Sequence, residues 1–277
     1  MNTLTSILVH ADASTQTITR LQAAAALARA HEASVHALYA VLPIYTQYPY
    51  SLSISAEAAA LLQEAEDGRS ARARTLFDQA VSSAALPIGW SAATGDPVQA
   101  FTRAAACSDL VVLSQNEPDN ELRSDVPSDF VPSVIIGSGR PTLVLPNRHE
   151  GADIGRVVLL AWKPTREAAH ALAGSLPLLC KADKVHVALW NDSEDSSTDG
   201  RKDIERYLRA HGITADVHGY GPESRDVGEY LLSLASDVGA DLLVMGCYGH
   251  GRMREWALGG ATRSVLRSMT VPVLMAH

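Results

Sequence analysis

The stretch that decides the fold runs from Asp241 to Gly249 and reads Asp-Leu-Leu-Val-Met-Gly-Cys-Tyr-Gly. Its apolar centre, 242–245, has no polar alternation, which is typical of a strand buried on both faces of a parallel sheet. Gly246 and Gly249 follow directly, and a helical pattern begins at Gly260. A glycine-rich turn between a strand and a helix N-terminus suits a phosphate, because backbone N–H groups can approach the anion closely.

Working outward, short apolar runs alternate with longer helical patterns along the whole chain. This alternation predicts an α/β, doubly wound fold with parallel sheets covered on both faces. The expected strands are 6–11, 34–41, 88–93, 109–114, 141–146, 156–162, 184–190, 214–219, 241–246 and 271–276. The expected helices are 15–30, 56–84, 98–107, 165–179, 200–210, 225–238 and 260–268, with a weaker one over 127–136.

The two halves of the chain repeat each other, which predicts one fold used twice. Residues 35–38 (Val-His-Ala-Leu) match 185–188 (Val-His-Val-Ala), and 109–113 match 241–245. The run 140–145 likewise matches 271–275. We therefore expect one domain over 1–147 and another over 153–277, joined by a polar, glycine-containing stretch.

Composition narrows the class of protein. Of the 277 residues, 47% are hydrophobic, which excludes a mainly disordered chain. The net charge of −8 argues against a general nucleic-acid binder, because most of the surface would repel a phosphate backbone. Residues 1–150 carry a net charge of −6 and residues 151–277 a net charge of −2.

The expected location is cytoplasmic. The three cysteines form no disulfide framework and no CxxC metal pattern, which indicates a reducing compartment. The first residues do not form a signal peptide, and the sequence has no run of about 20 apolar residues to span a membrane.

A local excess of positive charge accompanies the glycine turn. Residues 246–277 hold four arginines, at 252, 254, 263 and 267, against the single acid Glu255. A bound polyanion would need such an excess. The structural alternative stays open, since glycines after a parallel strand often serve only a tight turn and close helix packing.

The spacing Gly246-x2-Gly249-x9-Gly259 resembles the nucleotide motif of the universal stress protein family, Gly-x2-Gly-x9-Gly-Ser/Thr. The flanking runs 258–266 and 271–275 are also typical of that family. Because the similarity extends to both halves, the chain is identified as a tandem, UspA-like member. The resemblance implies two five-stranded parallel sheets with about four helices each, close to the adenine nucleotide alpha hydrolase group. It also implies a pseudo-dimer in which 143–145 meets 273–275.

The same resemblance implies a stress-response binding or signalling module with an ATP site, and Mg²⁺ with it, in the second half. Backbone donors would come from Gly246, Gly249, Gly259 and Gly260, and Arg252 would reach phosphate. The end of the first strand of that half, Ala161-Trp162-Lys163, would line the nucleoside side. Two positions depart from the family pattern. Gly260 stands where the motif has Ser or Thr, and Lys163 stands where the family has an Asp that contacts the nucleoside.

The first half shows the opposite pattern. Asp12 matches the nucleoside-contacting Asp, although an N-cap role for Asp12 is an equal alternative. The loop at 114–117 keeps neither glycine and is followed by several acids, so we expect no ATP there.

Other interpretations remain open. The chain could be a nucleotide-free member that binds another small ligand or a protein partner. A slow ATPase is a third possibility, although no residue stands out as its base or metal ligand. We expect no catalytic residues and no metal site of the protein's own, and a homodimer is possible. His36 and His186 occupy matching positions, which indicates a shared packing role.

Overall fold

The computed structural model describes residues 3–47, 55–84, 86–116, 125–149, 153–190, 197–220, 226–249 and 260–277. The chain forms two compact units. The first unit is Thr5–Ser138, and the second is Gly139–His277 with the start of the chain up to Leu4. The domain limits drawn from the repeat, 1–147 and 153–277, stay a proposal.

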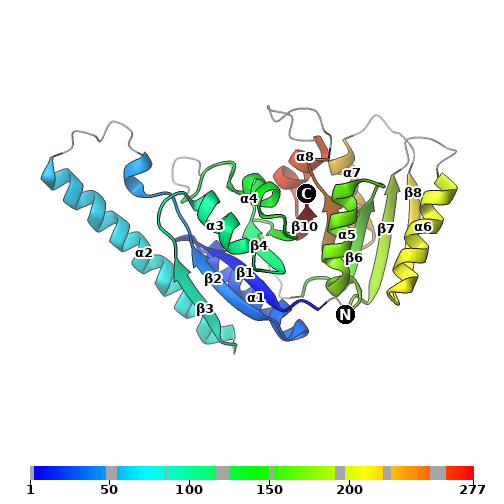
Figure 1. The fold of residues 1–277 in the computed structure, drawn as a ribbon, viewed down its shortest axis with the longest axis horizontal. Coiled ribbons are helices and arrows are strands. Elements are labelled where there is room, and N and C mark those ends of the chain that lie inside the picture. Colours follow the sequence, from blue (N-terminus) through cyan, green and yellow to red (C-terminus); the bar gives the residue numbers. More distant parts are fainter. Residues whose placement is uncertain are drawn as a thin grey trace. The chain divides into compact units, whose positions relative to one another are not determined.

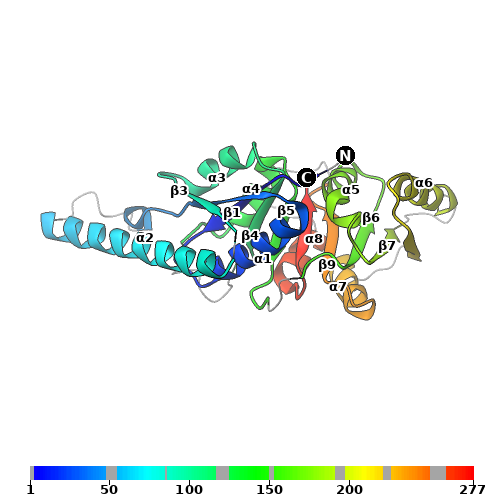
Figure 2. The same cartoon turned by 90° about the horizontal axis from the view of Figure 1, so that it is seen from below.

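In the first unit, four parallel strands are ordered β3-β2-β1-β4. Helices α1 and α2 lie side by side on one face of this sheet, and α3 and α4 lie on the other (Figures 1 and 2). The strands are β1 (Ser6–Ala11), β2 (Ser34–Tyr39), β3 (Ile88–Ala92) and β4 (Leu110–Ser114). The helices are α1 (Gln16–His31), α2 (Ala56–Ala84), α3 (Pro97–Ala105) and α4 (Phe130–Ser138), and a 3₁₀ turn, η1, covers Ile44–Gln47.

In the second unit, five parallel strands are ordered β10-β9-β6-β7-β8. A sixth strand, β5 (Thr142–Leu145), pairs antiparallel with β10, so that Leu143 lies opposite Leu274. The expected meeting of 143–145 with 273–275 is therefore confirmed. The parallel strands are β6 (Val157–Trp162), β7 (Lys184–Trp190), β8 (Ala215–Tyr220), β9 (Leu242–Gly246) and β10 (Val273–Ala276). The helices are α5 (Arg166–Leu179), α6 (Ser197–Ala210), α7 (Val227–Asp237) and α8 (Gly260–Ser268).

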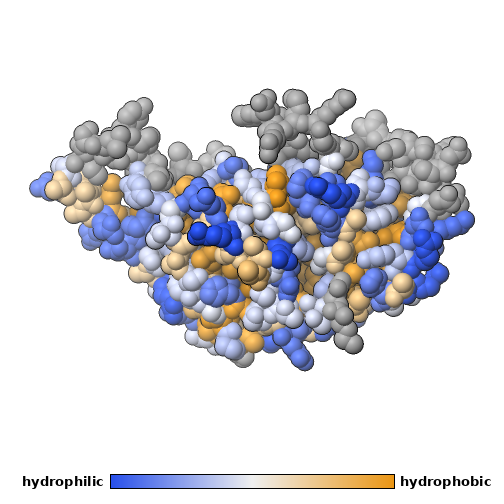
Figure 3. All heavy atoms as spheres, in the orientation of Figure 1, coloured by the Kyte–Doolittle hydropathy of each residue, from blue (hydrophilic) through white to orange (hydrophobic). Residues whose placement is uncertain are grey.

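The central strands form the core of each unit. All five residues of β4 are buried, as are the first four of β9, which explains their continuous apolar sequences. Helix α6 buries only Ile204 and Leu208 among its described side chains, and most of its remaining residues are charged (Figure 3). None of the helices in the described part of the chain is long and apolar enough to cross a membrane.

The repeat seen in the sequence has a structural counterpart at the start of each unit's central strand. The Asp109 carboxylate accepts hydrogen bonds from the backbone N–H groups of Thr5 and Ser6. In the second unit, Asp241 accepts from the backbone N–H groups of Gly155, Arg156 and Val157. The repeated aspartate therefore fixes the start of β1 and of β6, because it satisfies donors that lie outside the ladder.

The expected elements are found, with small shifts at their ends. Strands β2 and β10 are shorter than expected by two residues each, and α6 begins three residues earlier. The weaker helix expected over 127–136 is α4, which starts at Phe130. The 3₁₀ turn η1 was not predicted, because four residues carry too little periodicity to mark one. The predicted α/β class with parallel sheets and four helices for each half is confirmed.

Candidate functional site

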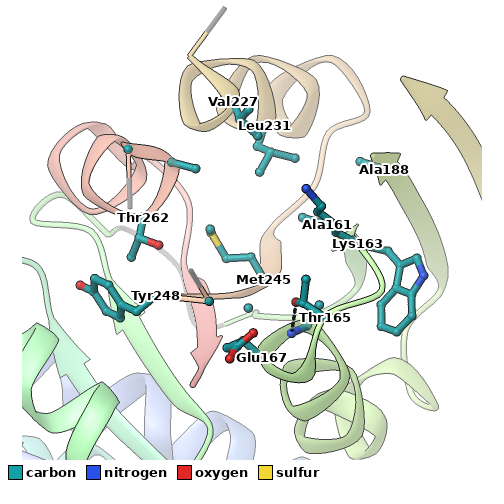
Figure 4. Close-up of a pocket in the computed structure, with 16 residues that line it drawn as sticks. Ala161, Lys163, Thr165, Glu167, Ala188, Val227, Leu231, Met245, Tyr248 and Thr262 are labelled. Carbon is teal, nitrogen blue, oxygen red and sulfur yellow. Dashed lines mark hydrogen bonds between the residues drawn. The ribbon is translucent and has the colours of Figure 1, made fainter. Parts of the chain in front are cut away.

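A cavity of about 380 Å³ lies in the second unit at the carboxyl ends of β6 and β9, between the first turns of α5 and α8 (Figure 4). Ligands of open α/β sheets bind at such edges. The lining brings together six of the eight predicted site residues, namely Ala161, Trp162, Lys163, Gly246, Gly249 and Gly260. The other two, Gly259 and Arg252, lie outside the described residues.

Most of the lining is apolar or small. The floor consists of Ala161, Ala188 and Met245, which come from three neighbouring parallel strands. Val227 and Leu231 of α7 form one wall (Figure 4). A mainly apolar cavity with a few polar groups is the usual composition of a small-molecule site.

Gly246 is required by packing. A Cβ atom added there would lie 2.4 Å from the backbone nitrogen of Ala168 and 2.8 Å from its Cα. Because these are backbone atoms at the start of α5, no rotamer change could relieve the clash. Gly246 therefore allows β9 to end directly against α5, so its presence is not by itself a sign of phosphate binding.

Gly249 and Gly260 have different surroundings. A Cβ atom at Gly249 would meet the Glu167 carboxylate, with Oε2 at 2.6 Å, whereas a Cβ atom at Gly260 would have no atom of the described residues within 4 Å. Gly260 is also the first residue of α8, where backbone N–H groups lack intrahelical partners. These N–H groups and the partial positive charge of the helix end suit an anion at this side of the cavity.

The backbone between these glycines is unusual at Tyr248. Its φ of 57° lies in the left-handed region, which residues other than Gly, Asn and Asp rarely adopt. Its hydroxyl is buried and has no hydrogen-bond partner among the described residues. Such backbone conformations cluster at ligand-binding sites, where the surrounding structure maintains them.

Lys163 and Glu167 are the charged side chains of the lining, and they lie on different sides of it (Figure 4). Lys163 is half-buried and lies toward Leu231 of α7. Glu167 is only 8% exposed, and its carboxylate lies against Gly249. Sequence reasoning missed Glu167, because an acid in the first turn of a helix is common and stabilises the helix dipole.

Two further groups complete the site. The buried Thr262, in the first turn of α8, lines the cavity with Ala261. The Cys247 thiol lies beneath the loop and donates to the Ala276 carbonyl, with Sγ and O 3.3 Å apart. Burial, and then the nearby Glu167 charge, raise the pKa of Cys247 well above its ordinary value, so the thiol stays protonated.

In the first unit, three aromatic side chains fill the corresponding position. His10 packs between Phe101 and Phe130, with ring centroids 5.5 Å and 4.7 Å away, and all three are buried. By the repeat, His10 corresponds to Ala161 and Phe101 to Leu231, while Phe130 opens α4 as Gly260 opens α8. The side chains that leave a cavity in the second unit are therefore replaced by larger ones in the first.

Asp12 is engaged inside the first unit. Its carboxylate pairs with the guanidinium of the buried Arg20 at 2.8 Å. It also accepts hydrogen bonds from the backbone N–H and hydroxyl of Ser14 and from the Thr17 hydroxyl. Asp12 is not the N-cap of α1, which is Thr15, so the N-cap interpretation is wrong. Asp12 instead serves as the partner of the buried Arg20. The sequence could not show this role, because Arg20 lies one turn into α1 and meets Asp12 only in the folded unit.

A second ion cluster in the first unit centres on Arg69 of α2. Its guanidinium contacts the Leu42 carbonyl, Glu66 and Asp125. Asp125 also accepts a hydrogen bond from the Ala13 backbone N–H, and burial raises its pKa. No group of three or more potential metal ligands occurs among the residues that the structure describes.

A parallel sheet with helices on both faces and a cavity at the carboxyl ends of its strands is the arrangement in which open α/β sheets hold small ligands. Residues 180–277 match the model of the Universal stress protein family. The match falls in the second half of the chain and agrees with the resemblance that the glycine spacing Gly246-x2-Gly249-x9-Gly259 indicates.

Solved structures share the fold over the whole chain. A universal stress protein of Archaeoglobus fulgidus DSM 4304 is 18% identical with a TM-score of 0.73, covering 98% of this chain and 97% of its own. A putative universal stress protein of Pseudomonas aeruginosa UCBPP-PA14 is 17% identical with a TM-score of 0.60, covering 99% and 93%. A universal stress protein solved in complex with cAMP is 21% identical over 44% of this chain and 96% of its own, with a TM-score of 0.37. No curated protein matches the chain.

Proposed function

We propose that this protein is a ligand-binding module of the stress response whose second unit binds an adenine nucleotide, with ATP as the first candidate. The supporting observation is the cavity of about 380 Å³, which is bounded by Gly246, Gly249 and Gly260 on one side and by Ala161 and Lys163 on the other. Its volume suits a ligand of drug-like or nucleotide size.

Each side of the cavity would serve one part of the nucleotide. The apolar floor and the α7 wall offer surface for an adenine ring, and the N-terminus of α8 offers N–H donors for phosphate. Gly259 and Arg252 join the proposed phosphate side on the strength of the motif. Lys163 would act only as a hydrogen-bond donor to the ligand, since an ammonium group cannot accept a hydrogen bond from a ribose hydroxyl.

The direct test is to denature the purified protein and look for released adenine nucleotide by absorbance and chromatography. The melting temperature is then measured with and without Mg-ATP, because a ligand that binds only the folded state raises it. No released nucleotide together with no shift would contradict the proposal. Phosphate release over hours would point instead to a slow ATPase.

A pair of glycine variants locates the site. Gly249→Glu adds a second carboxylate beside Glu167 and should abolish the shift with Mg-ATP. Gly200→Glu is the control, because a Cβ atom at Gly200 in α6 meets nothing within 4 Å, and it should leave the shift unchanged. Binding retained by Gly249→Glu would put the nucleotide elsewhere.

A cytoplasmic location, a homodimer and a protein partner stay predictions. The described cysteines are all free, with Cys107 and Cys180 exposed and Cys247 buried, as a reducing compartment would keep them. Analytical ultracentrifugation with and without Mg-ATP would test the homodimer.

A further inference from the structure

The loop side of the cavity carries a negative charge where the proposed phosphates would lie. Residue 167 touches both described glycines of the motif. Its carbonyl carbon would be 2.6 Å from a Cβ atom at Gly246, and its carboxylate Oε2 would be 2.6 Å from one at Gly249. The carboxylate is thus held against the backbone that would receive an anion.

In the part of the chain that the structure describes, a single exposed cation pairs with this carboxylate. Among the described residues, the ion pair of Glu167 is with Arg166, whose Nε lies 3.4 Å from Oε1. The Arg166 side chain is 66% exposed, whereas that of Glu167 is 11% exposed, so water screens the cation more than the anion. Lys163 lies on the other side of the cavity (Figure 4).

We propose that Glu167 selects the ligand of this cavity by charge, so that a nucleotide binds with its phosphates few in number or neutralised by a divalent cation. This inference rests on the proposed nucleotide binding and deepens it. Uncomplexed ATP brings several negative charges toward a carboxylate in a poorly hydrated site, where like charges repel strongly. Adenosine brings none, and Mg²⁺ placed between the phosphates and Oε2 turns the repulsion into attraction.

The competing interpretation is purely structural. An acid in the first turn of α5 stabilises the helix dipole whether or not a ligand binds. In that role, removing the carboxylate would lower the melting temperature of the free protein and would change the affinities for adenosine, AMP, ADP and ATP by the same factor. Charge selection instead makes the effect of removing the carboxylate grow with the number of phosphates.

The experiment compares the unmodified protein with Glu167→Gln by calorimetric titration of adenosine, AMP, ADP and ATP in EDTA, and of ATP with Mg²⁺. The Glu167→Gln protein should bind ATP without Mg²⁺ about tenfold more tightly than the unmodified protein does, while its adenosine affinity changes little. With Mg²⁺ present, the Glu167→Gln protein should bind ATP less tightly than the unmodified protein does, because the cation loses the carboxylate as a ligand. Glu229→Gln, which changes an exposed first-turn acid of α7, is the matched control and should leave every affinity unchanged.

The outcomes separate this inference from the proposed function. Both proteins could bind adenosine and its phosphates, with Glu167→Gln changing the affinities for adenosine and for ATP by the same factor. In that case charge selection is wrong and nucleotide binding stands. If neither protein binds any member, with or without Mg²⁺, the proposed function fails and this inference fails with it. Glu167→Ala, tested in parallel with the melting temperature of each free variant, guards against a folding defect in one of them.

Discussion

Among the described residues, three buried ring side chains pack together in the first unit at the positions that border a cavity in the second. In the first unit, His10, Phe101 and Phe130 pack against one another with centroid separations of 4.7–5.8 Å. In the second, the corresponding positions are alanine, leucine and the glycine-led start of α8, and a cavity remains. One fold thus supports either a packed core or a ligand site, and the volumes of three side chains decide which.

The charged residues follow the same division. Asp12 in the first unit has its hydrogen-bonding capacity used by Ser14, Thr17 and Arg20. Lys163, at the corresponding position of the second unit, lines the open cavity. The position that carries a buried, ion-paired carboxylate in the first unit therefore carries a half-buried ammonium group at the cavity in the second.

The largest effect is expected from breaking the ion pair of the filled crevice. Asp12→Ala leaves the Arg20 guanidinium, which is 3% exposed, without its carboxylate partner. Removing one partner of a buried pair costs about 3–5 kcal/mol in the free energy of unfolding. Denaturant unfolding would measure this loss. The control is Asp78→Ala, which breaks an exposed pair with Arg74 and should cost about 1 kcal/mol or less. Similar losses in both variants would contradict the buried role of Asp12.

The next largest effect is the pH dependence of stability that His10 causes. Burial, and then the Arg20 charge, lower the pKa of His10 to about 4, against the opposing pull of Asp12. The unfolded chain takes up this proton near pH 6.5 and the folded protein only near pH 4, so stability is present above pH 6.5 and is lost as the pH falls toward 4. The loss across this window is about 3 kcal/mol. Asp12, whose pKa the Arg20 and His10 charges hold below its usual range although burial opposes them, contributes only at still lower pH.

Denaturant unfolding at a series of pH values checks this prediction. His10→Gln should flatten the slope between pH 6.5 and pH 4. A small slope should remain, because burial and the charges of Lys184 and His218 also lower the pKa of His186. An unchanged slope in His10→Gln would show that other groups dominate.

A third variant converts the open crevice toward the filled one. Ala161→Leu should occupy the cavity floor and weaken nucleotide binding by at least about tenfold, because the added side chain takes the volume of the ring. Its free energy of unfolding should change by only about 1 kcal/mol, since the space already exists. Ala169→Leu, on the exposed face of α5, is the control and should leave binding unchanged. Undiminished binding in Ala161→Leu would remove the cavity from the proposed site.

The smallest effect is expected from restoring the family's hydroxyl. Gly260→Ser adds a donor where nothing lies within 4 Å of the new Cβ atom. One added hydrogen bond of about 1 kcal/mol corresponds to a several-fold gain in Mg-ATP affinity, measurable by titration. Gly260→Ala has the same backbone effect without the hydroxyl and should show no such gain. Equal affinities for the two variants would place the phosphates away from α8.

Much of the fold could be predicted from the sequence, because the spacing of apolar residues within each segment indicates a helix or a strand. The buried runs of β4 and β9, the glycine turn after β9 and the repeated aspartates at 109 and 241 each predict their own element. The repeat then predicted two copies of one topology, and the pairing of β5 with β10 followed from the family resemblance. The glycine spacing marked Gly246, Gly249 and Gly260, and all three line the cavity.

The sequence could not show which side chains meet at the carboxyl ends of the strands in each unit. His10, Phe101 and Phe130 come from β1, α3 and α4, and only their packing reveals that they occupy one space. The closeness of Glu167 to Gly249 likewise depends on α5 lying against the end of β9, which the sequence does not encode locally. The sequence by itself determined the order of helices and strands and the repeat, because these depend on patterns between neighbours. The tertiary structure decided which half keeps a cavity and which charge faces it, because volume and electrostatic potential are set by residues far apart in the chain.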